Sequence, residues 1–433
     1  MAAPNRPARW PRLSAQPADQ ATVRRSNLSL VLRHLHDLGP RSRATIAAET
    51  GLNKATVSSL VAELLERRLV VEVGAERAGA VGRPALILEL DGSGVGALGL
   101  EVNVDYLAAL ATDLAGRILY ERRVPYDALA EPPPAALDAL AGLAREALAT
   151  LASSGAVPAG ATVAVPGLVD VARGVVTLAP NLGWRGVRVA DRLRDALGRP
   201  PYPITVDNDA NLSALAEYRV GADAGTAHLV YLTGEVGVGG GVIVDGRLLR
   251  GAEGFSGEVG HLPVDPRGPE CGCGRRGCWE TVVGMAALFR LAADPDDQAV
   301  NGAGLDPEDR LGEVLRRAAS GDRRTLDALD EIGRYLGFGA SILVNVFNPR
   351  VIVLGGYFAR VGGYIAGAAT AELRLRAIAP NAGGCRVALS TLGFSAAVHG
   401  GAGVAVEAVL ADPTLVPRAA LGVAPTPSVA EGA

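Results

Sequence analysis

Four possible metal ligands lie within a short segment and constrain the local fold more than any other feature of the chain. His261 is followed by Cys271, Cys273 and Cys278, interleaved with Gly and Arg, in GHLPVDPRGPECGCGRRGCWE. Three thiolates and one imidazole form a closed tetrahedral zinc site, which is structural because no position is left for a catalytic water. A disulfide is the alternative, but it would leave one of the three thiols unpaired. The fourth cysteine, Cys385, is expected in the core.

Charge divides the chain into a basic head and an acidic body. Residues 1–90 carry a balance of +5 and residues 91–433 a balance of −9, which together give the net charge of −4. A basic head favours an anionic partner such as double-stranded DNA. No apolar run is long enough to span a membrane, and the first residues do not resemble a signal peptide, so we expect a cytoplasmic protein with no membrane partner.

The basic head has the pattern of a helix-turn-helix. Residues 26–38 place apolar side chains on one helical stripe, with Ser26 or Asn27 as the expected cap. Further on, the small Ala47, the turn residue Gly51 and the apolar Val57 have the spacing that two crossing helices require. Ser42 and Asn53 are the expected caps of these two helices.

Two predicted strands follow, Leu69–Val73 and Ala85–Leu90, and together they form a β-hairpin wing. Arg83 lies near its tip, where an arginine can enter a minor groove. The second helix carries polar residues off its apolar stripe, which can reach phosphates or base edges. The predicted DNA-binding residues are therefore Asn53, Lys54, Thr56, Ser58, Ser59 and Arg83. The alternative is a helical hairpin that contacts another protein.

The body alternates strands with helices, which predicts an α/β fold. Gly94, Gly96 and Gly99 spell G-x-G-x-x-G, but a strand-like alternation follows in place of a helix, so we interpret the match as chance. The expected elements are a helix at 132–153, a strand at 162–170, a strand and helix at 204–218, two strands at 227–249, a solvated loop at 293–309, two helices at 311–346, a strand at 348–356 and a helix at 395–411.

The body resembles the ROK family, which comprises repressors, open reading frames and sugar kinases. The resemblance covers about residues 93–410 and rests on VDNDAN (206–211), GVGGG (237–241), GEVGH (257–261), CGCGRRGCWE (271–280) and NPRVIVLGG (348–356). It implies a two-lobed, actin-like fold of the sugar kinase and hexokinase type. With a winged helix in front, the chain is similar to the family's transcriptional repressors of xylose and N-acetylglucosamine metabolism.

The resemblance also implies a sugar site. The family's sugar contacts fall on Asn208, Asp209, Glu258, His261 and Glu280, with Gly167 and Asn181 as further cleft residues. Carboxylates and an amide can each bind neighbouring hydroxyls, and His261 can present one ring nitrogen to zinc and the other to the sugar. The alternative for Asn208 and Asp209 is an ordinary loop in which Asp209 caps the next helix.

The segments that correspond to the phosphate-binding loops of the family's kinases differ from them in sequence. Their D-x-G-G-T phosphate loop falls on Glu101–Asp105, where both glycines and the threonine are absent and Asp105 would repel a polyphosphate. Val236 replaces a threonine in the second loop, although the glycines of that loop persist, and GGY at 355–357 replaces the family's third glycine pattern. Asp209 keeps the identity of the kinases' general base. We therefore expect a regulator that binds sugar but not ATP, with an active sugar kinase as the alternative.

The expected domains are a flexible segment at 1–22, the winged helix at 23–92, the ROK domain at 93–411 and a flexible tail at 412–433. The ROK domain should divide into two lobes near residue 205, with its last helix returning to the first lobe. A homodimer or homotetramer would bind an inverted-repeat operator, and sugar binding would change its affinity for DNA. A sugar-responsive protein that binds other proteins and not DNA is a third possibility.

Overall fold

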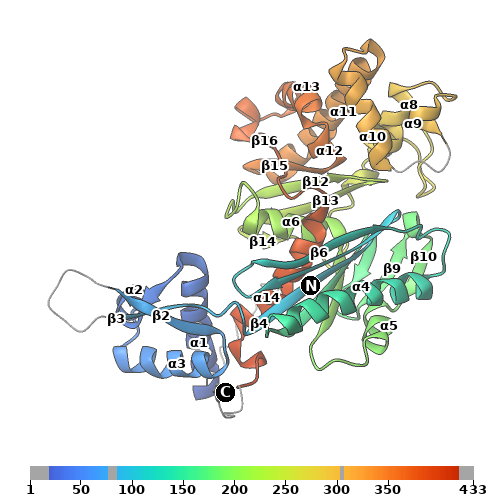
Figure 1. The fold of residues 1–433 in the computed structure, drawn as a ribbon. Coiled ribbons are helices and arrows are strands. Elements are labelled where there is room, and N and C mark those ends of the chain that lie inside the picture. The colour runs from blue at the N-terminus through green and yellow to red at the C-terminus, as the bar shows by residue number, and fades with distance from the viewer. Residues whose placement is uncertain (1–18, 77–84, 303–306, 419–433) are drawn as a thin grey trace, which may run out of the picture. The chain divides into compact units, whose positions relative to one another are not determined.

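The computed structural model describes residues 19–76, 85–302 and 307–418. They divide into two compact units. One contains the described residues up to Leu90 together with those from Ala408 onward, and the other contains Asp91–Glu407. The fold is α/β, with a helix-turn-helix region at the N-terminal end of the chain and a larger body of sheets and helices (Figure 1).

The first unit contains three helices and a small sheet. Asn53 caps α3 by accepting a hydrogen bond from the Thr56 backbone N–H at 2.8 Å, as predicted, and Ser42 caps α2 in the same way. Gly51 ends α2 in the left-handed conformation. The strands pair in the order β1-β3-β2. The elements are α1 (Gln20–Leu38), β1 (Arg41–Ser42), α2 (Arg43–Thr50), α3 (Lys54–Glu66), β2 (Val70–Glu76) and β3 (Ala85–Leu90).

The first helix begins earlier than the sequence predicted. The expected cap at Ser26 or Asn27 is wrong, because Asp19 caps α1 and accepts a hydrogen bond from the Thr22 backbone N–H at 2.7 Å. No glycine or proline interrupts residues 20–26, so the helix continues upstream of its apolar stripe.

A buried carboxylate forms ion pairs with three arginines of this unit. Glu63 of α3 is 4% exposed and forms ion pairs with Arg24, Arg67 and Arg418 at 2.6, 2.8 and 3.1 Å. Burial alone would raise the pKa of Glu63, but the three guanidinium groups outweigh it and hold the pKa at about 2. Arg418 belongs to the segment predicted to be a flexible tail from residue 412, yet 412–418 pack on this unit.

The second unit is built on two five-stranded sheets. The first has the order β11-β7-β4-β5-β6 and the second β14-β13-β12-β15-β16, and a three-stranded sheet has the order β10-β9-β8. The strands are β4 (Val95–Val102), β5 (Tyr106–Asp113), β6 (Ile118–Pro125), β7 (Val157–Val165), β8 (Leu168–Asp170), β9 (Val175–Ala179), β10 (Trp184–Val187), β11 (Ile204–Asn208), β12 (Leu229–Gly234), β13 (Val238–Val244), β14 (Arg247–Leu248), β15 (Val351–Gly356) and β16 (Arg386–Leu389).

Helices cover these sheets. α4 packs on β4 and β5, α6 contacts strands of both large sheets, and α11 packs along α13 (Figure 1). The helices are α4 (Pro133–Ser153), α5 (Val189–Ala196), α6 (Asp209–Val220), α7 (Glu280–Val283), α8 (Met285–Ala292), α9 (Gln298–Asn301), α10 (Pro307–Ala319), α11 (Arg323–Phe347), α12 (Tyr357–Arg360), α13 (Gly362–Arg376) and α14 (Ala396–Ala411). Short 3₁₀ turns lie at Pro180–Leu182, Val259–His261, Pro380–Gly384, Gly393–Ser395 and Pro413–Leu415.

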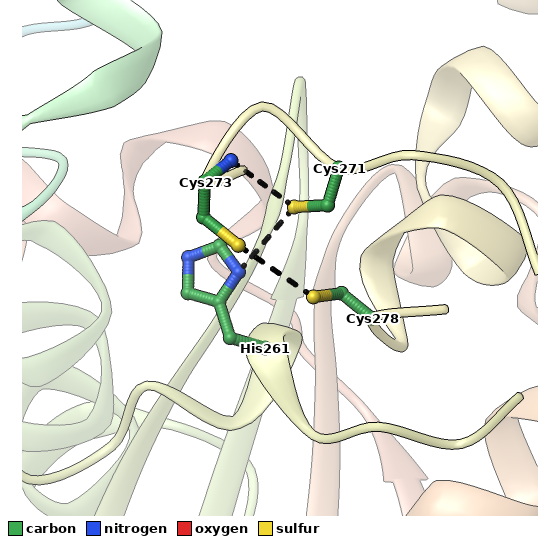
Figure 2. A group of neighbouring side chains, drawn as sticks. All are labelled: His261, Cys271, Cys273 and Cys278. Carbon is green, nitrogen blue, oxygen red and sulfur yellow. Dashed lines mark hydrogen bonds between the residues drawn. The ribbon is translucent and has the colours of Figure 1, made fainter. Parts of the chain in front are cut away.

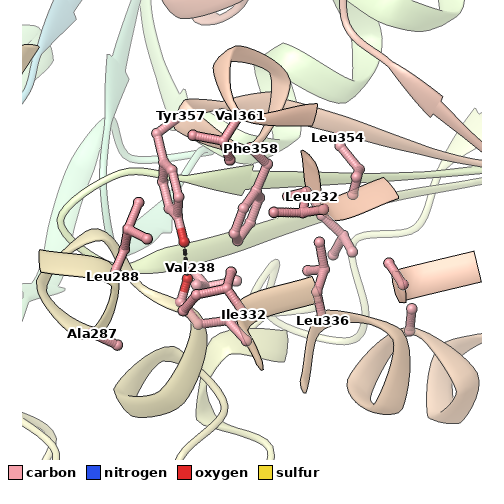
Figure 3. Packing of buried hydrophobic residues seen from close by; sticks show 14 of the residues in the cluster. Leu232, Val238, Ala287, Leu288, Ile332, Leu336, Leu354, Tyr357, Phe358 and Val361 are labelled. Atoms are coloured by element: carbon pink, nitrogen blue, oxygen red, sulfur yellow. Dashed lines mark hydrogen bonds between the residues drawn. The ribbon is translucent and has the colours of Figure 1, made fainter. Parts of the chain in front are cut away.

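The core beside the second sheet is aliphatic with a few aromatic rings. Tyr357 and Phe358 are fully buried against leucines of the strands and of α11 (Figure 3). The Tyr357 hydroxyl donates to the Val283 carbonyl, so the one polar atom of this ring is satisfied. Cys385 is buried in the same core, as predicted.

α14 approaches the first sheet closely because glycines line the contact. A Cβ at Gly99 of β4 would lie 1.7 Å from the Val398 carbonyl oxygen. Gly99 is thus explained by packing, and the G-x-G-x-x-G segment lies in a strand followed by an antiparallel strand, as predicted. The segment Gly393–Ala411 is the one described helix long and apolar enough to cross a membrane, but half of it is buried inside the protein, as in a soluble core helix.

The predicted loop at 293–309 is partly wrong, since α9 forms within it and α10 begins at Pro307. Asp297 caps α9, accepting from the Ala299 backbone N–H at 3.0 Å, and its carboxylate also pairs with Arg317. The polar composition thus supports helix caps and ion pairs here.

We expect Glu63→Gln to weaken the first unit by about 3 kcal/mol, because the folded-state pKa lies well below its ordinary value. That stability is present above pH 4.5 and is lost as the pH falls towards 2. Hydrogen exchange in α1 and α3 at pH 7 should accelerate about 100-fold. Asp37→Asn, at a 65% exposed aspartate of α1 outside this ion-pair cluster, is the control, and equal exchange in both variants would contradict this role.

Candidate functional site

One cavity of the second unit brings together all the residues predicted to contact sugar. Its lining includes Gly167, Asn181, Asn208, Asp209, Glu258, His261 and Glu280. They come from four separated parts of the chain: the loop after β7, the turn after β9, the β11–α6 junction and the segment between β14 and α7. A set chosen from motifs alone therefore converges in space.

The β11–α6 junction positions the amide of this set. Asn208 caps α6 by accepting a hydrogen bond from the Asn211 backbone N–H at 3.0 Å. Its Nδ2 donates to the Gly167 carbonyl at 3.1 Å, which joins this junction to the loop after β7. The alternative in which Asp209 caps the helix is wrong, because Asp209 is already its first residue.

Arg250 forms an ion pair with the same junction, and the sequence analysis did not identify it. Its two terminal nitrogens contact the two carboxylate oxygens of Asp207 at 3.1 and 2.6 Å. Asp207 is 4% exposed, so a bidentate partner offsets the cost of burying its charge. Arg250 begins the loop that leads to Glu258. An arginine seven residues before the GEVGH motif was the available signal.

Burial raises the pKa of two carboxyl groups that line the cavity. It raises the pKa of Asp209 to about 6, and it raises the pKa of Glu258 to about 7 with help from the neighbouring acidic groups. Gly237 lies against this set, since a Cβ there would be 2.9 Å from Glu280 Oε2 and 3.0 Å from Asn181 Nδ2. Carboxyl and amide groups this close together suit a ligand with several neighbouring hydroxyls.

The predicted metal ligands form a compact cluster at one edge of the cavity (Figure 2). The ligand atoms of His261, Cys271, Cys273 and Cys278 all lie within 4.8 Å of one another. Cys271 Sγ is 3.6 Å from His261 Nδ1, and Cys273 Sγ is 3.7 Å from Cys278 Sγ. Tetrahedral zinc–thiolate geometry requires separations of about 3.5–3.8 Å, so the cluster fits a metal ion.

His261 joins the cluster to the cavity. Its Nδ1 faces the thiols, while Nε2 lies 4.0 Å from Glu258 Oε2. Glu280 Oε1 is 2.8 Å from Cys271 Sγ, so a second cavity residue also touches the cluster. The metal ligands and the predicted sugar ligands are therefore one connected group.

The other side of the cavity contains a polar network that sequence analysis found only in part. Glu101 and Asn103 are 0% and 2% exposed, and Asn103 Nδ2 donates to Glu101 Oε1 at 3.1 Å and also to Glu235. Tyr106 donates to Glu101 at 2.8 Å. Burial raises the pKa of Glu101 to about 8 and that of Glu235 well above its ordinary value. Glu235, which was missed, stands directly before Val236.

The predicted DNA-binding residues of α3 lie on its accessible side. Lys54, Ser58 and Ser59 are exposed and Thr56 is half-buried, whereas Val57 and Leu60 face the core. Arg24 of α1, also missed, contacts Ser59 and is 45% exposed. Arg83 lies outside the described residues.

Comparison with known proteins gives consistent results. Residues 97–408 match the ROK family and residues 29–80 match the MarR family. The chain is 32% identical over 337 residues to the xylose repressor of Bacillus spizizenii, covering 78% of this chain and 83% of the repressor.

Two solved structures show the same relationship. A ROK family transcriptional regulator, a homologue of the Escherichia coli Mlc protein, superposes with a TM-score of 0.74 and 27% identity over 92% of this chain and 98% of its own. A ROK family glucokinase from Streptomyces griseus, in complex with glucose and AMPPNP, has a TM-score of 0.61 and 30% identity over 72% of this chain and 99% of its own.

A sugar-kinase-like body combined with a helix-turn-helix defines a class of DNA-binding regulators that respond to sugars. The chain belongs to the ROK family, and it is a sugar-responsive transcriptional repressor.

We expect the purified protein to contain about one zinc ion per chain by elemental mass spectrometry, because the four ligand atoms are already within coordination range of one centre. Cys278→Ser should lose most of that metal, and Cys385→Ser, a buried cysteine outside the cluster, should keep it. Equal metal content in the two variants would rule out this ligand set.

Proposed function

We propose that this protein represses genes of sugar metabolism from an inverted-repeat operator, and that a sugar in the cavity changes its affinity for that operator. The observation that carries the proposal is the convergence of seven predicted sugar-site residues in one cavity of a chain that also has a DNA-binding domain. The protein acts in the cytoplasm as a homodimer or homotetramer, because an inverted repeat requires two copies of the reading helix.

DNA is read by α3. The exposed Lys54, Ser58 and Ser59 supply donors for phosphates and base edges, and Asn53 and Thr56 lie at the helix N-terminus, which favours anions. Arg83 of the wing is proposed to contact the minor groove. Arg24, beside Ser59, adds a further positive charge next to this face.

A zinc ion bound at the predicted ligands would hold the sugar-binding loop in shape. It would be bound by His261, Cys271, Cys273 and Cys278 as a structural ion. His261 then has a fixed orientation in which Nε2 can contact a sugar hydroxyl. Asn208, Asp209, Glu258 and Glu280 bind the other hydroxyls, with Gly167 and Asn181 completing the wall.

ATP is not bound, and the protein is not a kinase. Support comes from the network around Asn103, where buried carboxyl groups of Glu101 and Glu235 stand at the positions of two phosphate loops. The Glu235 backbone N–H is used in a turn, donating to the Gly237 carbonyl at 2.9 Å. A polyphosphate would meet carboxyl groups where kinases supply free N–H donors.

The direct test selects bound fragments from a random DNA pool with the full-length protein and then titrates the recovered operator against a sugar panel. We expect a discrete inverted repeat and a sugar that shifts the operator Kd by about 5- to 150-fold. Recovery of no specific sequence, or an operator affinity that no sugar changes, would contradict the proposed function.

Lys54→Glu should weaken operator binding about 10- to 100-fold, because it replaces a phosphate-binding cation with an anion. Gel-shift titration at fixed salt measures the change. Arg173→Glu, an 81% exposed charge reversal in the body, is the control. If both variants bind like the wild type, α3 is not the reading helix.

A coupled assay with ATP and a panel of hexoses and pentoses should detect no phosphorylation above background. The reason is the loss of the glycines and threonine of the first phosphate loop, together with the buried carboxyl groups of Glu101 and Glu235 beside both loops. The purified Streptomyces griseus glucokinase serves as the positive control. Appreciable turnover by this chain would establish the kinase alternative.

A further inference from the structure

We propose that two copies of this chain associate through the exposed face of α11 and α13, with these helices antiparallel to those of the second copy. This inference rests on the proposed function, because an inverted repeat requires two copies of the reading helix, and it names the surface that joins them. The surface lies wholly within the second unit, where α11 packs along α13 (Figure 1).

An apolar ridge lies at the C-terminal end of this face. It consists of Leu375, in the last turn of α13, and Ile378, two residues after the helix, and these side chains are 77% and 91% exposed. The Ile378 backbone N–H donates to Asn345 Oδ1 at 2.9 Å, so the ridge is held beside the end of α11. Large aliphatic side chains this open to water at neighbouring positions are typical of an interaction surface.

A groove lies between the two helices, next to the ridge. It has a volume of about 480 Å³ and is lined by Glu331, Arg334, Tyr335, Phe338, Glu372 and Arg376. The half-buried rings of Tyr335 and Phe338 make part of its wall apolar, and the Arg376 guanidinium lies 4.5 Å from the centroid of the Phe338 ring. Cavities of this size hold drug-sized molecules, so the groove has room for the two side chains of a ridge.

α11 and α13 run in the same direction. Gly337 of α11 lies against Ala369 of α13, where a Cβ on the glycine would clash with the Ala369 carbonyl oxygen. Further along both helices, Asn345 contacts Ile378. Residue numbers therefore increase together along the pair, which places the ridge at one end of the face and the start of the groove, at Glu331, towards the other.

The face is formed before any partner binds. Trp279 is fully buried, and its Nε1 donates to the Tyr335 carbonyl at 2.9 Å. Gly339 lies so close to the Trp279 ring that a Cβ there would clash with it. These contacts fix α11 on the core, so association requires no folding step.

The charges of the groove identify a second copy as the occupant. Its N-terminal part has one base and one acid, Arg334 and Glu331, and its C-terminal part again has one of each, Arg376 and Glu372. A two-fold axis places the N-terminal part of one groove against the C-terminal part of the other, and each ridge against the opposite groove. Glu331 then faces Arg376 of the second copy, and Arg334 faces Glu372. A partner with one sign of charge would meet like charges at both ends.

Sedimentation velocity of the full-length protein tests the surface. We expect the wild type to be a dimer or a tetramer, and the double variant Leu375→Glu/Ile378→Glu to lose one association step. Its dissociation constant should rise at least about 100-fold, because two carboxylates would enter a partly apolar groove. Leu129→Glu, at a 61% exposed leucine between β6 and α4, is the control and should sediment like the wild type.

A charge exchange tests the antiparallel arrangement independently of folding defects. Glu331→Arg or Arg376→Glu alone should weaken association about 10-fold, because like charges meet across the two-fold axis. The double variant Glu331→Arg/Arg376→Glu restores opposite charges at both contacts and should recover most of the loss. A double variant that associates no better than the single variants would overturn this arrangement.

The outcomes separate this inference from the proposed function. If Leu375→Glu/Ile378→Glu associates as well as the wild type, the inference is overturned, while binding of two copies to the operator and sugar control remain intact. If the wild type is monomeric both alone and on its operator, the inference fails together with two-copy binding. Titration of the operator complex with sugars then decides sugar control separately.

Discussion

The junction between β11 and α6 is the constraint on which the functional cavity depends. Three consecutive polar residues, Asp207, Asn208 and Asp209, lie where a buried strand becomes a helix, and each must be compensated for lost water. Arg250 forms an ion pair with Asp207. Asn208 accepts a hydrogen bond from the backbone of α6 and donates one to the Gly167 carbonyl. Burial raises the pKa of Asp209. The same contacts fix the loops that carry Gly167 and Glu258.

The two sides of the cavity show how a kinase-like body can be adapted to regulation. On the side of the predicted sugar ligands, the cluster of His261 and three cysteines forms one connected group with the carboxyl groups of Glu258 and Glu280. On the opposite side, the Asn103 amide donates hydrogen bonds to both Glu101 and Glu235. Asn103 and Glu235 are 132 residues apart in the chain. The proposed loss of ATP binding rests on these contacts.

The C-terminal segment belongs structurally to the DNA-binding unit. α14 packs on the first sheet through Gly99, and the residues from Ala408 onward pack with the helix-turn-helix. There Arg67 donates to backbone carbonyls of the C-terminal segment, and Arg418 pairs with Glu63. Residues from Ala408 onward are therefore part of the DNA-binding unit, although they lie at the opposite end of the chain from the helix-turn-helix.

The sequence by itself determined the helix-turn-helix and the caps at Ser42 and Asn53, because these depend on short-range spacing within motifs. Short-range spacing also predicted the four clustered residues that could hold a metal ion, whereas the seven cavity residues followed from the resemblance to the ROK family. Only the tertiary structure decided the roles of Arg250, Glu235 and Glu63. Each is an ordinary charged residue in the sequence, and its importance comes from partners far along the chain and from burial. The cost of a buried charge depends on its three-dimensional surroundings, and local sequence does not specify those surroundings.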